Sequence, residues 1–342
     1  MRRSLFDRRS DGLTAGLTAA VALMMLAVWP SGRLAAQDAP LNAGALFLVF
    51  PVGAQAVGMG QTATAAAGRG EAAFWNPAGL ATLTDDEFSL HSANLVAGRS
   101  SVLGAYFPSR GIGVIGAAVY LVDYGDLDRT DAGGNTIARI APRNFEFLAS
   151  YATNLTGSFV FGVSYKLVQF RVDCSGDCRD FPAGTGATHA LDLGGQFRVG
   201  PGGPLRIGVA LRNVGFRLQV QNQAQADPLP TRLAVGALYE IRLRPTTGGA
   251  LDEAFDLKLA ADVDSPWGQV GQSETRFGLD IGYQRLVRVR AGYAFVQDGL
   301  SGPSVGLGIE SGSLGVDFAR AFLTNSDLQV ESPTFFSFRV TF

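Results

Sequence analysis

This 342-residue sequence is poor in the residues that build metal sites, with two cysteines and two histidines. A Cys- or His-rich metal centre is therefore nearly excluded. Charge is also scarce: 17% of the residues are charged, against about 25% in a typical soluble domain. The formal net charge is −2, which argues against a nucleic-acid partner because such proteins usually carry a basic excess. We expect neither a cofactor nor nucleic-acid binding.

The first 36 residues read as a targeting segment. They combine four arginines near the start with an uncharged apolar stretch at 13–29, and small residues precede Gln37. A positive start, an apolar centre and a small-residue cleavage site define a secretory signal peptide. We predict that residues 1–36 are removed near Ala36 and that the protein leaves the cytoplasm.

Long hydrophobic runs are missing from the rest of the chain. Residues 39–67 carry no charge, but Pro51 and four glycines interrupt them, and their apolar core covers only residues 45–52. A membrane-spanning helix needs about 20 predominantly apolar residues. We therefore expect no transmembrane helix after the signal peptide.

Alternation of apolar and polar residues with a period of two is the dominant pattern. It is clearest at residues 205–212, 255–264, 276–283 and 287–293, and it indicates strands with one apolar and one polar face. In a soluble sandwich the apolar face would pack on a second sheet. In an outer-membrane barrel it would face lipid, and the polar face would line the lumen.

The loop lengths favour the barrel. Connections after even-numbered strands are mostly tight, with residues 243–254 as the exception, and most of those after odd-numbered strands are long. Short turns on one side and long loops on the other are typical of outer-membrane barrels. We predict an all-β, antiparallel transmembrane barrel of about 14 strands over residues 87–342. The runs lie near 87–95, 100–108, 111–122, 143–153, 158–170, 188–200, 204–214, 231–242, 255–264, 274–283, 287–295, 303–311, 313–322 and 334–342.

The last strand carries an assembly signal. Its lipid-facing side would present Phe336, Phe338, Val340 and Phe342, with Phe342 ending the chain. An aromatic C-terminal residue on an alternating final strand resembles the signal read by the barrel-assembly machinery. Tyr120 and Tyr293 are expected near the outer rim, in the aromatic girdle of the barrel.

Two motifs near the start of the mature chain resemble a known family. The first contains Gly58 and Gly60 within residues 53–60, and the second is the run Trp75-Asn76-Pro77-Ala78-Gly79. Together they resemble the PorV/PorQ family of the FadL-like superfamily of fourteen-strand outer-membrane barrels. The resemblance implies that residues 37–86 fold into the barrel as a plug. From the residues alone, a Gly/Ala-rich helix and turn packed in the lumen is nearly the same structure.

The resemblance implies two functions. A PorV-like protein would act in type IX secretion, taking secreted cargo from the translocon and passing it to surface attachment. A FadL-like protein would carry a hydrophobic ligand across the outer membrane, and a plain structural barrel is the fallback. A charged lumen favours the first. The expected partners are outer-membrane lipid, the barrel-assembly machinery, and secreted cargo or a translocon, and no enzymatic activity is expected.

The phase of the alternation predicts which charges face the lumen. A charge facing lipid near the bilayer centre would cost about 2–4 kcal/mol, so these side chains should point inward. They could form a selective polar channel, or ion pairs that fill the barrel and hold the plug, and we favour the ion pairs. The predicted luminal charges are Arg206, Arg212, Lys258, Arg276, Asp280, Arg288 and Arg290, together with Asp192, Asp256 and Asp262.

The two longest outer loops are candidates for a docking surface. Residues 123–142 and 171–187 are long and rich in Arg and Asp, whereas loops without a role tend to be short. Cys174 and Cys178 lie close together in the second loop, which favours a small disulfide in an oxidising compartment. Two free thiols or a metal clip are the alternatives. No catalytic residue is predicted.

Overall fold

The computed structural model describes residues 44–342, apart from short gaps at 180–183, 220–225, 244–254, 268–272, 285, 297–298, 326–327 and 330–331. All described residues belong to one compact unit, Asp38–Phe342. The predicted signal peptide and its cleavage site lie outside the described residues.

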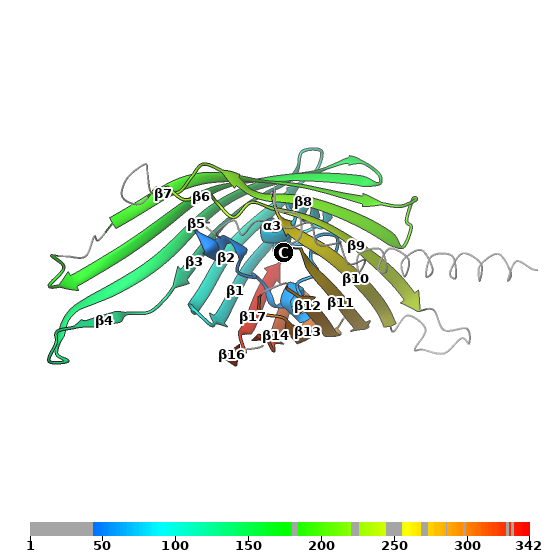
Figure 1. Ribbon diagram of the computed structural model, residues 1–342. Coiled ribbons are helices and arrows are strands. Elements are labelled where there is room, and N and C mark those ends of the chain that lie inside the picture. The colour runs from blue at the N-terminus through cyan, green and yellow to red at the C-terminus, as the bar shows by residue number, and fades with distance from the viewer. Residues whose placement is uncertain are drawn as a thin grey trace, which may run out of the picture. The chain divides into compact units, whose positions relative to one another are not determined.

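Among the described residues, fourteen long strands form one antiparallel sheet in which each strand pairs with its neighbours along the chain (Figure 1). Pairing of the first strand with the last closes the sheet. The prediction of a fourteen-strand barrel is confirmed. The strands are β1 (Glu87–Leu95), β2 (Gly98–Ser109), β3 (Gly113–Asp123), β5 (Thr136–Thr156), β6 (Phe159–Gly176), β7 (Gly184–Arg198), β8 (Leu205–Gly215), β9 (Arg232–Leu243), β10 (Phe255–Pro266), β11 (Glu274–Tyr283), β12 (Val287–Phe295), β13 (Gly302–Ser311), β14 (Leu314–Ala321) and β17 (Thr334–Thr341).

The predicted outer loops are shorter than expected because much of them is strand. The segment at 123–142 contains β4 (Leu127–Thr130) and the start of β5, and the segment at 171–187 contains the end of β6. β5 and β6 have 21 and 18 residues, against about 9–11 needed to cross a bilayer. The start of β5 and the end of β6 therefore continue beyond the barrel wall, together with β4. A second small hairpin joins β15 (Thr324–Asn325) to β16 (Leu328–Gln329).

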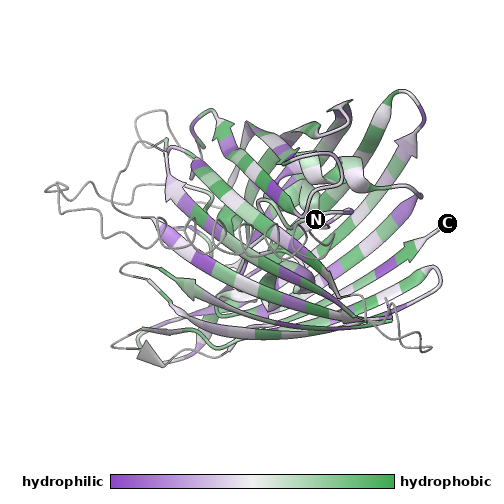
Figure 2. Cartoon of the chain, turned by 90° about the vertical axis from the view of Figure 1, so that its right-hand side faces the viewer, coloured by the Kyte–Doolittle hydropathy of each residue, from purple (hydrophilic) through white to green (hydrophobic). Residues whose placement is uncertain are grey.

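The two faces of the wall follow the predicted alternation (Figure 2). In β14, Leu314, Val316 and Phe318 are exposed on the outer face, and Gly315, Asp317 and Ala319 are buried inside. The outer face of such strands is the lipid-facing one. The prediction for Tyr120 was wrong, because this side chain is 1% exposed and points into the lumen.

The region before β1 forms four short helical elements inside the barrel. They are η1 (Leu46–Val49), α2 (Ala54–Gly58), α3 (Ala72–Trp75) and η2 (Pro77–Thr82). α2 contacts β12, β13, β14 and β17, and η2 contacts β5, β6 and β7. We call residues 44–83 the N-terminal segment. None of the helices in the described part of the chain is long and apolar enough to span a membrane.

Candidate functional site: the filled lumen

The N-terminal segment is held by polar groups of the barrel wall. The backbone N–H of Ala54 donates to Ser337 Oγ over 2.8 Å, and that of Gly60 donates to Ser304 Oγ over 3.0 Å. Asp262 Oδ2 accepts two N–H groups, from Ala63 and Thr64, each at 2.8 Å. Buried backbone donors must find partners, so these inward side chains replace the water that the segment would otherwise bind.

Asn76 is the most connected residue of the predicted motif. Its side-chain amide donates to the carbonyl oxygens of Thr64, Gly195 and Val209, at 2.7, 3.3 and 3.3 Å. Its Oδ1 accepts the N–H of Ala78 over 3.2 Å and so caps η2. Since Asn76 is fully buried, it ties two turns of the segment to the wall at β7 and β8.

The small residues of the motifs permit close approach. A Cβ on Gly60, where φ is +66°, would lie 2.5 Å from the backbone nitrogen of Tyr293. A Cβ on Gly58 would approach Gly306 to 3.0 Å, and one on Gly79 would lie 2.3 Å from Ala67 O. The segment thus packs backbone against backbone at these positions.

The side chain of Trp75, at the end of α3, connects the N-terminal segment to the charges of the wall. Its indole N–H donates to Val52 O over 2.9 Å. The guanidinium carbons of Arg212 and Arg276 lie 5.4 and 5.9 Å from its ring centroid. Both distances suit cation–π attraction, so two predicted luminal arginines contact a predicted motif residue.

One side of the lumen, which we call the ionic half, is lined by β8–β14 and β17. Asp264 accepts from Arg212 at 2.6 Å and from Arg232 at 2.7 Å, and Arg276 lies 3.4 Å away. Glu274 pairs with Arg232 over 2.6 Å and also with Arg276. Two carboxylates thus share three guanidinium groups away from bulk water.

A second network of the ionic half continues from strand to strand. Arg290 joins Asp280 at 3.0 Å to Asp317 at 2.6 Å. Arg288 joins Asp256 and Asp280, each at 2.7 Å. On the segment, Gln55 donates to Asp317 over 3.0 Å.

The remaining charges of the ionic half lie at its margins. Arg339 bonds Asp317 over 2.7 Å and also Glu310. Arg206 lies 3.7 Å from Glu240, and Lys258 lies across from Asp280 and Glu240 on the adjoining strands. The structure therefore places the predicted luminal charges inside the barrel, most of them in ion pairs.

The opposite side, the apolar half, was not expected from the sequence. The Phe47 ring lies 5.8 Å from that of Tyr120, and the Phe74 ring lies 6.2 Å from it. The wall here contributes Val102, Tyr106, Val114, Ala118, Val122, Leu148, Ala152, Val168 and Ala190. The expectation of a charged lumen holds for only half of the barrel. Inward-phase residues 114, 118, 120 and 122 are all apolar, a signal that was present in the sequence.

A buried polar cluster interrupts the apolar half. Lys166 Nζ lies 3.4 Å from Glu146 and 2.8 Å from Asp192, and it donates to Asn213 Oδ1 over 2.9 Å. A β-bulge between β7 and β8 places Arg212 and Asn213 opposite Asp192, and Asn213 has a φ of +59°. The bulge lets two consecutive residues face inward. Sequence reasoning missed it, because alternation assigns them to opposite faces.

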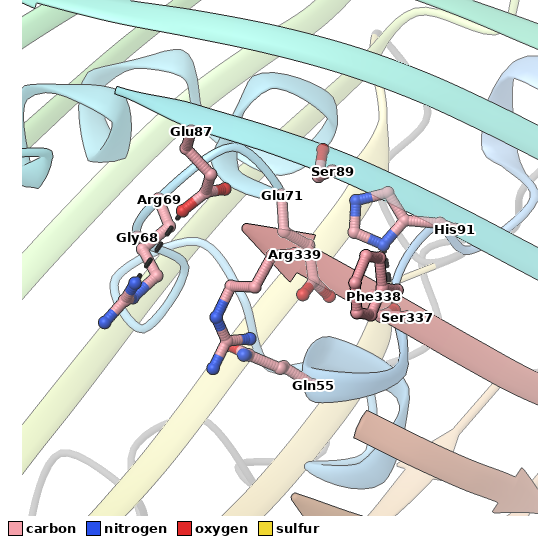
Figure 3. Close-up of a pocket in the computed structure, with 10 residues that line it drawn as sticks. All are labelled: Gln55, Gly68, Arg69, Glu71, Glu87, Ser89, His91, Ser337, Phe338 and Arg339. Atoms are coloured by element: carbon pink, nitrogen blue, oxygen red, sulfur yellow. Dashed lines mark hydrogen bonds and ion pairs between the residues drawn. The ribbon is translucent and has the colours of Figure 1, made fainter. Parts of the chain in front are cut away.

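A small polar pocket lies where the segment meets the ends of β1 and β17 (Figure 3). Glu87 Oε1 accepts the N–H of Gly70 over 2.9 Å, and His91 Nδ1 lies 2.8 Å from Ser337 Oγ. Glu71 accepts the N–H of Ala56 over 2.8 Å. Burial raises the pKa of Glu71 to about 8.

The family follows from the sequence of this barrel. A model for the type IX secretion system protein PorV matches residues 34–255, which is more than half of the chain. The chain belongs to the PorV family. This PorV-family barrel therefore lies in the outer membrane and has a role in type IX secretion. No curated protein matches the sequence at a significant level.

Solved outer-membrane transport proteins share the fold of this PorV-family chain. The toluene transporter TodX of P. putida matches with a TM-score of 0.58 at 12% identity, over 85% of this chain and 98% of that chain. The CymD monoaromatic hydrocarbon channel matches with a TM-score of 0.56 at 14% identity, over 85% and 97%. At such identities the likeness concerns the fold alone.

Outside the lumen, the hairpin beyond the barrel forms what we call the outer extension, residues 124–142 and 171–179. Cys174 and Cys178 are joined by a disulfide, and Arg143 pairs with Asp123 over 3.2 Å at its base. At its tip, Arg179 lies 2.9 Å from Asp177. The predicted docking loops are thus largely ordered β-structure, except for residues 180–183, which lie outside the described residues.

Proposed function

We propose that this PorV-family barrel is a docking partner in secretion, and that a secreted protein or a translocon component binds its outer extension. The carrying observation is that β5 and β6 run past the barrel. At about 3.4 Å per residue, the seven residues of β5 from 136 to 142 reach roughly 24 Å outward. The outer extension contributes nothing to closing the barrel, and this supports a role in binding.

The inward-phase side of the outer extension suits an apolar partner segment. Leu127, Ile140 and Cys174 are cross-strand neighbours and share one face. Asp128 and Arg139 are paired on the other face. Because Ile140 is in phase with the lumen-facing side chains of β5, the apolar face looks over the barrel mouth. A partner that buries it would leave the charged face in water.

The filled lumen supports docking over conduction. We propose that the N-terminal segment serves as a plug, as the sequence motifs imply. Its backbone bonds to Ser337, Ser304 and Asp262 and the ion pairs beside it occupy the space that a passage would need. No catalytic role is proposed, since His91 is engaged with Ser337 rather than with the adjacent Ser92.

Photo-crosslinking in intact cells tests the docking role. A crosslinkable residue at Ile140 should yield protein adducts, whereas the same residue at the neighbouring Arg139, on the opposite face, should yield few. Serine at Cys174 and Cys178 should lower the yield from position 140, because a looser tip loses more entropy on binding. Equal adducts from both positions, or none, would argue against the proposed face.

A FadL-like conduit for hydrophobic molecules is the second candidate, and the apolar half of the lumen favours it. It requires the N-terminal segment to leave the rings around Tyr120. Uptake of a labelled fatty acid into cells tests this. Transport that rises in Asn76→Ala, whose segment is less firmly anchored, would favour the conduit, and uptake equal to that of cells without the protein would exclude it.

A further inference from the structure

Two buried carboxylates differ from the others in the lumen. Within the described residues, Asp264, Asp280 and Asp317 each contact at least two arginines. Glu71 and Asp262 form no ion pair in that part of the chain, and each accepts backbone N–H groups of the N-terminal segment. Both carboxylates without a cation partner therefore hold the segment through its backbone.

Glu71 is packed against the start of α2. Its Oε1 accepts the N–H of Ala56, and a Cβ on Gly53 would lie 2.1 Å from the same oxygen. Gly53 has a φ of +89°, so another residue would be both strained and in collision. The neighbouring N–H of Ala54 donates to Ser337 Oγ. Ser337 also forms a hydrogen bond with His91 (Figure 3).

The charges around Glu71 do not neutralise it. Arg290 is engaged by Asp280 and Asp317, and Arg339 is engaged by Asp317 and Glu310. Burial is the largest influence on Glu71 and raises its pKa. The bond from the N–H of Ala56 opposes this rise, and the negative charge of Asp317 adds to it. The titratable or charged groups facing it are Arg69 on its own segment, Glu87 and His91 on β1, Tyr106 on β2, Arg290 on β12, Glu310 on β13, Asp317 on β14 and Arg339 on β17.

We propose that Glu71 is a protonation-controlled latch: the neutral carboxyl group seats α2 against β13, β14 and β17, and its ionisation loosens that contact. Ionisation would place a charge without a cation partner in a buried site, which is costly. α2 would then move away from the wall, while the Asn76 anchor at β7 and β8 would keep the rest of the segment in place. The latch is independent of docking at the outer extension.

The sign of the pH dependence follows from the raised pKa. The seated form binds the proton of Glu71 more tightly than the loosened form. Seating is therefore strongest below about pH 4.5, the ordinary pKa of a glutamate side chain. Seating is lost as the pH rises through about 8. The ionised fraction would grow from about 10% at pH 7 to about 90% at pH 9.

Fluorine NMR on the full-length barrel in a bilayer tests the latch. A fluorinated label on Gln55→Cys, in α2, should show a second state whose population rises about ninefold between pH 7 and pH 9. A label on Ala81→Cys, in η2, should not change. Glu71→Gln should abolish the transition at position 55, and Asp262→Asn should leave its midpoint unchanged.

Three spectroscopic results would overturn the proposal. One is a transition that persists in Glu71→Gln, and another is a transition that disappears in Asp262→Asn instead. The third is a constant spectrum at position 55 from pH 6 to pH 9.5. If Glu71→Gln fails to assemble, Glu71→Met is the second neutral variant. Failure of both to assemble would also contradict the idea, because the neutral side chain is the one said to seat the helix.

Discussion

The two halves of the lumen fill the same kind of space by different chemistry. In the apolar half, the segment inserts Phe47 and Phe74 against Tyr120. In the ionic half, the wall fills itself with paired side chains such as Asp264 and Arg232, and the segment contributes mainly backbone and small residues. Segment and wall both contribute aromatic rings to the apolar half, whereas most bulky side chains of the ionic half come from the wall.

This difference between the two halves indicates where the N-terminal segment could detach from the wall. Apolar packing is non-directional and tolerates small shifts, whereas a buried ion pair is costly to leave half-made. The ion pairs of the ionic half are therefore completed within the wall itself. The apolar half depends on the N-terminal segment, because removing Phe47 and Phe74 would expose apolar side chains of the wall to water.

The largest effect should come from unbalancing the ionic half. Asp264→Ala leaves Arg212 and Arg232 buried beside a missing partner, and breaking a buried pair in this way costs about 3–5 kcal/mol. We expect the heat-modifiability transition of the folded barrel on gels to fall to a markedly lower temperature. A transition temperature within a degree or two of the wild type would show that water or other carboxylates replace Asp264.

A smaller loss is expected in the apolar half. Phe47→Ala removes the ring that packs on Tyr120 and should destabilise the seated segment by about 3 kcal/mol. The barrel wall itself should keep its unfolding temperature, while proteolysis of the segment becomes faster. Phe47→Leu is the matched control and should cost less than about 1.5 kcal/mol. Equal protease sensitivity of both variants would contradict a packing role for the ring.

The C-terminal residue should matter for assembly more than for the lumen. Phe342 is exposed on the outer face, and its ring stacks on Phe88 of β1 at 5.4 Å. Its deletion removes an apolar contact of about 1.5–3 kcal/mol with lipid and the pairing of the first and last strands at their ends. We expect lower levels of folded protein in outer-membrane fractions, and normal levels would refute this.

Much of the barrel could be predicted because its wall has two unlike faces. Strands such as β10 and β12 alternate charged and apolar residues, so their boundaries and their inward charges follow from the sequence. The apolar half could not be recognised in this way, since β3 carries apolar residues on both faces. In β3, the sequence pattern does not distinguish the inward-facing Tyr120 from a lipid-facing tyrosine.

Two further features depend on tertiary contacts that no local pattern encodes. The bulge at Asn213 depends on its long-range bonds to Lys166 and Asp192. Few side chains of the outer extension are buried, so the sequence of residues 127–130 and 136–142 resembles that of an ordinary surface loop. Sequence motifs located the N-terminal segment, but they did not indicate that Glu71 would be its unpaired carboxylate.

The smallest effect should be found where the same kinds of charges meet outside the barrel. Arg139 and Asp128 lie 3.5 Å apart in the outer extension, with more than half of each side chain exposed. Exposed pairs are worth about 0.2–1 kcal/mol because water and salt screen them. A double-mutant cycle on Asp128→Ala and Arg139→Ala should therefore give a coupling below about 1 kcal/mol. At 1 M salt, where screening acts over about 3 Å, that coupling should vanish, whereas the coupling between Asp264 and Arg232 should persist. If salt weakened both couplings equally, the ionic half would be open to solvent, and its difference from the surface would be lost.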